Sequence, residues 1–259
     1  MTCLGILLIF SAGGITLSQY GQFCPVAKVT ELLGEKWMLL ILRELLLGSR
    51  RYNEFQRALS RISPTLLTKR LKQLENAGII LRKQQQGRKG FEYLLTPVGR
   101  ELSPIIVHMA TWGMRWARGQ LDEDELDVEF LMWDIHRRLQ TDLLPDGETV
   151  MCFIFGDLVQ YKNWWLIACD GEVDLCTENP GKDVDLYIRT TLPDMVEIWN
   201  GDIEIKAALQ RKLLKTQGDS QLVKTLPEWL GICLYAEVRP GDTRLMKVAD
   251  EEYAEREKD

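Results

Sequence analysis

The sequence predicts an α+β protein with two domains, an N-terminal winged helix-turn-helix and a C-terminal domain of sheet and helices. Charge is the first observation: residues 1–120 carry seventeen Lys and Arg against seven Asp and Glu, which is +10, whereas residues 121–259 carry fifteen against thirty-one, which is −16. The second is a series of apolar helical stripes ending in two short strands, and the third is a later run of short strands separated by turns. The charge division indicates two units with different partners, since only the basic half suits a polyanion.

Residues 1–19 form an apolar extension whose run from Cys3 to Leu17 has no Lys or Arg before it. A signal peptide begins with positive charge, and a membrane helix needs about 20 apolar residues. We interpret the extension as non-essential and as a candidate for a wrongly chosen start codon, with a weak membrane anchor as the alternative. No stable membrane association is expected, and the predicted location is cytoplasmic.

Two helices are expected first. "PVAKVTELL", residues 25–33, has a proline suited to the first turn, and "KWMLLILRELLL", residues 36–47, is almost wholly apolar before Gly48. A helix that is apolar on most sides is typical of the centre of a core. "RYNEFQRAL", residues 51–59, is a shorter helix with apolar residues at spacings of three and four.

The next helix, residues 64–77, has Ser63 as its expected N-cap, Pro64 in its first position and Gly78 at its end. Leucines mark its buried face, while threonines and lysines point outward. "IILRKQ" and "FEYLL" are then two strands joined by the basic tip "QQGRKG", residues 85–90.

This order is that of a winged helix-turn-helix, in which the second helix enters the major groove of double-stranded DNA and the wing neutralises phosphates. The alternative is a solvated helix face beside an ordinary hairpin, but all the elements in order within a basic region favour DNA binding. The candidate DNA-binding residues are Arg51, Ser63, Thr65, Thr68, Lys69, Lys72, Arg88 and Lys89.

Residues 20–118 resemble the HxlR family of bacterial transcriptional regulators. The landmarks are Cys24-Pro25, Leu33-Gly34, Lys36-Trp37, Ile41-Leu42-Arg43, "RYNEF", Ile62-Ser63-Pro64, Leu71, Leu74-Glu75, Ala77-Gly78 and "YLLTPVGREL". The resemblance implies a dimeric repressor or activator, with the helices that flank the winged domain at the dimer interface. It also implies that Cys24 is a candidate redox sensor, the alternative being a small apolar residue packed in that interface.

A homodimer is also expected from a stripe that recurs at spacings of four and three, as in a helical seam. Pro104 lies inside the stripe and predicts a bend or a broken start near Ser103. The alternative is that the stripe belongs to the intramolecular core. Its members are Val98, Leu102, Ile105, Met109, Trp112 and Trp116.

The C-terminal domain is expected at residues 122–240, followed by a charged tail at 241–259. Asp122 is the expected cap of its first helix, and four strands, a short helix, another strand and a last helix follow. The pieces "DLYI", "WNGD" and "LPEWL" resemble the sterol carrier protein type two-like family, which implies a domain that binds an apolar small-molecule ligand. Six residues are either the lining of a pocket or filled core: Met151, Phe153, Phe155, Trp164, Tyr187 and Trp199.

Other site types lack their motifs. The six cysteines form no CxxC and the two histidines are far apart, so we predict no metal site and reduced, buried thiols. The sequence has no GxG, GxSxG or Walker loop, so we expect no cofactor and no enzymatic activity. The predicted function is transcription regulation by a DNA-binding dimer that responds to an apolar ligand. The alternative is an apolar-ligand carrier whose winged helix serves only dimerisation.

Overall fold

A computed structural model describes residues 20–84, 90–118 and 125–242. The chain divides into two compact units, Met1–His108 and Met109–Asp259, and each is described by itself. Helix α6, Ser103–Trp116, begins in the first unit and ends in the second. The predicted fold class is confirmed, with a winged helix-turn-helix followed by a sheet-and-helix domain.

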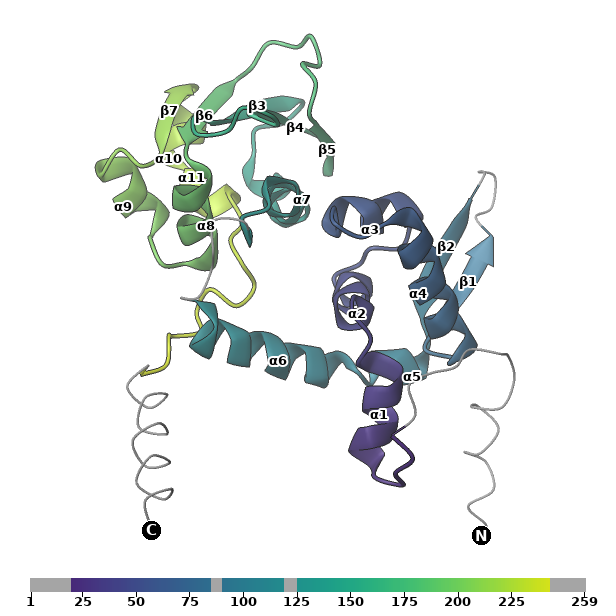
Figure 1. The fold of residues 1–259 in the computed structure, drawn as a ribbon. Coiled ribbons are helices and arrows are strands. Elements are labelled where there is room, and N and C mark those ends of the chain that lie inside the picture. The colour runs from purple at the N-terminus through teal and green to yellow at the C-terminus, as the bar shows by residue number, and fades with distance from the viewer. Residues whose placement is uncertain (1–19, 85–89, 119–124, 243–259) are drawn as a thin grey trace, which may run out of the picture. The chain divides into compact units, whose positions relative to one another are not determined.

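The first unit has the predicted order of elements, in which α4 lies beside the two wing strands (Figure 1). Strands β1 and β2 are antiparallel, with Ile80 opposite Leu95 and Gln84 opposite Phe91. Helix α2 is central as expected, since Met38, Ile41 and Leu42 have no exposed surface. The elements are α1 Pro25–Leu33, α2 Met38–Leu46, α3 Tyr52–Ala58, α4 Pro64–Asn76, β1 Ile80–Gln84, β2 Phe91–Leu95 and α5 Pro97–Arg100.

The predicted break before Pro104 is confirmed, because α5 ends at Arg100 and α6 begins at Ser103. Most of the stripe that the sequence places along this segment is exposed: Val98 by 56%, Met109 by 48% and Trp112 by 60%. Leu102 and Trp116 are partly buried, and Ile105 is exposed. The stripe is therefore largely outside the core of the single chain, which leaves an apolar helix face open to a partner.

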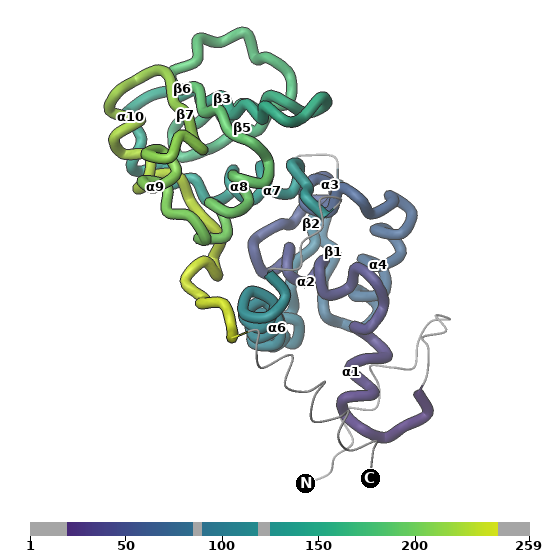
Figure 2. Tube along the Cα trace, turned by 60° about the vertical axis from the view of Figure 1, so that its left-hand side comes forward, coloured from purple at the N-terminus to yellow at the C-terminus, as the bar shows by residue number. Residues whose placement is uncertain are grey.

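The second unit is a five-stranded sheet in the order β5-β4-β3-β6-β7. Strands β3 and β6 are parallel, and the other neighbours are antiparallel. Helices α8 and α9 lie on the same side of this sheet in both views (Figures 1 and 2). The elements are α7 Val128–Arg138, η3 Thr141–Leu143, β3 Thr149–Phe155, β4 Asn163–Cys169, β5 Glu172–Cys176, β6 Leu186–Thr190, α8 Leu192–Asn200, α9 Ile205–Gln210, β7 Lys215–Gly218, α10 Ser220–Lys224 and α11 Leu226–Trp229.

One expected helix start is wrong. Helix α7 begins at Val128, and its cap is Asp127, whose Oδ1 accepts from the Phe130 amide at 3.0 Å. Asp122 lies outside the described residues. Both positions carry the same capping chemistry, so the pattern of the sequence could not choose between them.

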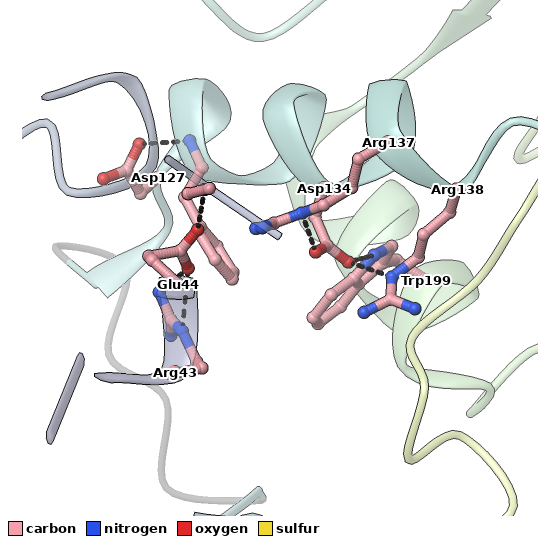
Figure 3. Close-up of polar contacts among 9 residues, drawn as sticks. Arg43, Glu44, Asp127, Asp134, Arg137, Arg138 and Trp199 are labelled. Carbon is pink, nitrogen blue, oxygen red and sulfur yellow. Dashed lines mark hydrogen bonds and ion pairs between the residues drawn. The ribbon is translucent and has the colours of Figure 1, made fainter. Parts of the chain in front are cut away.

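Helix α7 is attached to α8 through a buried carboxylate (Figure 3). Asp134 is 1% exposed, forms an ion pair with Arg137 at 2.8 Å, and accepts hydrogen bonds from Arg138 at 2.6 Å and from the Trp199 indole at 3.0 Å. Two guanidinium groups and an indole satisfy a charge that would be costly to bury alone. The Trp199 ring therefore has a structural role at the edge of the core.

Within the described ranges, every helix is too short or too polar to cross a bilayer.

Candidate nucleic-acid interface

The turn between α3 and α4 is held by side chains at the start of α4. Ser63 caps this helix by accepting from the Leu66 amide at 3.3 Å. The carbonyl of Pro64 accepts from the Tyr52 hydroxyl at 3.0 Å and from the Thr68 hydroxyl at 2.9 Å. The bond from Tyr52 joins the two helices of the motif at the end that a helix-turn-helix directs towards base edges, and the other two bonds fix the first turn of α4.

The predicted outward face of α4 is observed. Ser63, Thr65, Thr68, Lys69 and Lys72 are all exposed, and they lie on the side opposite the buried leucines. Because the Thr68 hydroxyl donates within the helix, its methyl group and oxygen lone pairs remain for a partner. Among the described residues, Lys69 and Lys72 have no ion pair, so their charges are available to phosphates or bases.

Arg51 is exposed at the start of α3 and is tied to the wing by its backbone. It bridges Glu92 in β2, and the Tyr93 amide donates to the Arg50 carbonyl at 2.8 Å. The Glu54 carboxylate accepts from the amides of Arg50 and Arg51 at 2.6 and 2.9 Å. The segment before α3 therefore pairs briefly with β2, and this pairing anchors the wing to the helix-turn-helix.

The wing-tip residues Arg88 and Lys89 lie outside the described residues. The described strands place another cation at the wing, which the sequence reasoning missed. The guanidinium of Arg82 lies 3.6 Å from the centre of the Phe91 ring, and both side chains are exposed. Stacking on an aromatic face restricts the guanidinium and suits it to phosphate recognition. The signal was available as an arginine and an aromatic residue at diagonal positions of the predicted hairpin.

Of the six residues left open between pocket lining and filled core, five pack in one core cluster and one lies on the other face of the sheet. Met151, Phe153 and Phe155 have no exposed surface, Trp164 is 3% exposed, and these four belong to the core between sheet and helices. Trp199 packs against the same core. Tyr187 lies on the opposite face of the sheet, since it is paired with Cys152 and packs with Val150 and Trp165.

A hollow of about 350 Å³ is present elsewhere in the second unit. None of the six predicted pocket residues lines it. Its apolar lining comes from the α8–α9 region, from α11 and from the segment that follows: Ile198, Ile203, Ile205, Pro227, Ile232 and Ala236. Its charged lining residues, Glu204, Lys206 and Glu237, are exposed. The hollow therefore combines an apolar wall with a polar rim, as small-molecule sites do.

The five described cysteines are free, but the expectation that they are buried holds only for Cys152 and Cys233. Burial raises the pKa of the Cys152 thiol to about 11. Cys169 is exposed, and the neighbouring Asp170 carboxylate raises the pKa of its thiol. Cys24 is half-buried at the N-terminus of α1.

Two family models match the chain in separate regions. Residues 32–121 match the HxlR-like helix-turn-helix, and residues 141–230 match the SCP-2 sterol transfer family. The predicted resemblances are thereby confirmed over the motif-bearing part of each half.

Individual relatives cover the N-terminal region. An uncharacterized HTH-type transcriptional regulator of Bacillus subtilis, YdeP, is 38% identical over 94 residues, which are 36% of this chain and 73% of the relative. The regulator sll1512 of Synechocystis is 42% identical over 97 residues, 37% of this chain and 72% of the relative. A solved structure titled redox regulator HypR in its oxidized form has 36% identity, covers 35% of this chain and 94% of that one, and has a TM-score of 0.34.

The elements of a winged helix-turn-helix, the family model and relatives matched over nearly three quarters of their length agree. The chain belongs to the HxlR-like helix-turn-helix family of transcriptional regulators.

Proposed function

We propose that the protein is a dimeric regulator that binds operator DNA with α4 in the major groove and the wing on the phosphates. The observation that carries this proposal is the exposed face of α4, where Thr65, Thr68 and Lys69 stand together on a helix whose other face is buried. Threonine and lysine side chains at the start of such a helix can reach base edges. The proposal assigns the chain no catalytic reaction.

A dimer is proposed on a separate observation. Ile105, Met109 and Trp112 are exposed along α6, and Val26 and Val29 are exposed on α1. Exposed apolar side chains that recur along a helix are typical of a surface that another protein covers. Two copies of a winged helix would read two half-sites of one operator.

Titration of the full chain against the DNA upstream of its own gene tests the proposal. Lys69→Ala should weaken operator binding by about 1–3 kcal/mol if Lys69 contacts a base. Arg88→Ala with Lys89→Ala should weaken all sequences alike and lower the salt slope by about one unit for each phosphate that is no longer neutralised. Lys162→Ala, at an exposed lysine of the second unit outside the hollow, is the control and should change neither the operator affinity nor the salt slope. Unchanged affinity and slope in the α4 and wing variants would contradict the proposal.

We also propose that the second unit senses an apolar small molecule. The match to the SCP-2 sterol transfer family supports a ligand-binding role, and the 350 Å³ hollow supplies an apolar site of suitable size. Native mass spectrometry of the purified chain would detect a bound molecule. Ile203→Trp should fill the hollow and exclude it, whereas Val159→Trp, at a 96% exposed position outside the lining, should not.

The alternative proposal is an apolar-ligand carrier whose winged helix serves only dimerisation. It predicts ligand binding without preference for any DNA sequence. The operator titration separates the two functions, because the carrier would show the same weak affinity for upstream and random DNA.

A further inference from the structure

The recognition helix α4 carries an arginine that does not face the proposed DNA surface. Arg70 is 7% exposed and lies on the buried face of α4, together with Leu67, Leu71 and Leu74. Gln73, one turn later, is 3% exposed. Two polar side chains on the apolar face of a helix need partners, because buried polar groups without hydrogen bonds are costly.

Those partners lie in the connection between α1 and α2. The Nε of Arg70 donates to the Lys36 carbonyl at 3.0 Å, and its Nη1 forms an ion pair with the Glu35 carboxylate. Nη1 also donates to Gln73 Oε1 at 2.8 Å, and Gln73 Nε2 donates to Glu35 Oε1 at 3.4 Å. Arg70, Gln73 and Glu35 form one closed network, which we call the α4 clamp.

The α4 clamp holds the backbone between α1 and α2 at a point where its conformation is restricted. Trp37 follows Lys36 directly and is left-handed, with φ of 80°. A side chain with a Cβ rarely adopts this conformation, so surrounding contacts must hold it. The bond from Arg70 to the Lys36 carbonyl is one such contact, and the guanidinium fork allows it to reach the carbonyl and the carboxylate together.

We propose that Arg70 and Gln73 are positioning residues for DNA recognition. Through Glu35, they fix the position of the exposed face of α4 relative to the connection between α1 and α2. This rests on the proposed reading of operator DNA by α4. A shift of α1 would then be passed to the reading face through Glu35. Arg70 itself contributes position and does not touch a phosphate.

The test compares Arg70→Met and Glu35→Gln in the full chain, with affinities measured for operator and random DNA across a salt series. Both variants should lose roughly 2- to 30-fold in the ratio of operator to random affinity. Random-DNA affinity and the salt slope should stay unchanged, since every phosphate-binding side chain is still present. Arg70→Lys should restore the ratio only partly, because an ammonium keeps the charge without the fork.

Glu35→Gln is the sharper of the two variants. Loss of a negative charge from a basic unit would by simple electrostatics strengthen DNA binding, whereas the clamp predicts weaker operator binding. Lys72→Met is the matched control on the exposed side of α4, and it should weaken both DNAs and lower the salt slope. Thermal unfolding identifies any variant that fails to fold, and Glu35→Gln decides the matter if Arg70→Met does fail.

An unchanged affinity ratio in folded Glu35→Gln would overturn the clamp. A salt slope lowered by about one unit in Arg70→Met would also overturn it, because Arg70 would then bind a phosphate directly. A wild-type chain that does not distinguish operator from random DNA would instead contradict the proposed function.

Discussion

At the scale of single residues, surroundings decide what a cysteine can do. Cys152 lies in β3 with 2% of its surface exposed, and burial raises the pKa of its thiol to about 11. At pH 7 roughly one such thiol in ten thousand is ionised, and the thiolate is the reactive form. Cys24 is partly exposed at the N-terminus of a nine-residue helix, so a reagent in solution can reach its sulfur.

We therefore expect mild peroxide or quinone to modify Cys24 before Cys152 in the folded protein. Mass mapping of the treated chain measures this order, and treatment in denaturant is the control, where Cys152 should become reactive. If Cys24 stays unmodified while DNA binding persists, it has no redox role and is a packing residue. Modification of Cys152 in the native state would show that its burial is not maintained in solution.

At the scale of elements, the start of α4 combines capping with the proposed DNA contact at one residue. Ser63→Ala should lower the free energy of unfolding by about 0.5–2 kcal/mol, because the Leu66 amide loses its acceptor. Ser63→Asp should keep the cap but place a negative charge on the DNA-facing side. Thermal unfolding and operator titration together test this: Asp should restore stability and still bind DNA poorly. Good DNA binding by Ser63→Asp would mean that this end of α4 does not approach phosphates.

The wing offers a second test at this scale. Phe91→Leu removes the ring beneath Arg82 and should weaken DNA binding by about 0.5–1 kcal/mol, the value of an exposed cation–π contact, without changing the salt slope. Arg82→Ala should lower the salt slope by about one unit. Affinities over a salt series distinguish the two effects. Identical slopes for Arg82→Ala and wild type would place Arg82 away from the phosphates.

At the scale of the whole molecule, the exposed α6 stripe predicts a dimer. Trp112→Glu should dissociate it, because a buried, unpaired carboxylate opposes association. Analytical ultracentrifugation measures the mass. Val107→Glu is the control: it makes the same kind of change at a 41% exposed position on another side of the same helix. A monomeric wild type, or a dimer in Trp112→Glu, would remove the stripe as the interface.

The last turn of α6 also belongs to the second unit, and this suits it to carry a ligand signal. Arg118 forms an ion pair with Asp202 and donates to the Asn200 carbonyl at 3.3 Å, while the Gly241 amide donates to the Arg115 carbonyl at 2.7 Å. Gly201, which lies between Asn200 and Asp202, lines the 350 Å³ hollow together with Ala236. A molecule in the hollow therefore lies beside the residues that hold the end of α6.

We expect a ligand of the hollow to change operator affinity by about 1–3 kcal/mol, and operator DNA to change ligand affinity by the same factor. Asp202→Asn should reduce this coupling and leave ligand affinity in the absence of DNA nearly unchanged, since Asp202 does not line the hollow. Titration of ligand with and without operator measures both directions. A ligand that binds and leaves DNA affinity untouched would contradict the sensor model and leave the second unit as a dimer-stabilising or partner-docking domain.

The sequence by itself determined the order of helices and strands in the first unit, the five strands of the second unit and the outward face of α4. Those features depend on local chemistry, such as Ser63 before Pro64 or the continuous run of apolar residues in β3. Only the tertiary structure decided that Arg70 points inward to Glu35, and that Tyr187 lies on the opposite sheet face from Phe153. The reason is that both features depend on contacts between separate elements. The direction of the Arg70 side chain depends on Glu35, which another part of the chain brings against α4. The face of a strand residue relative to another strand follows from their register, which no local pattern contains.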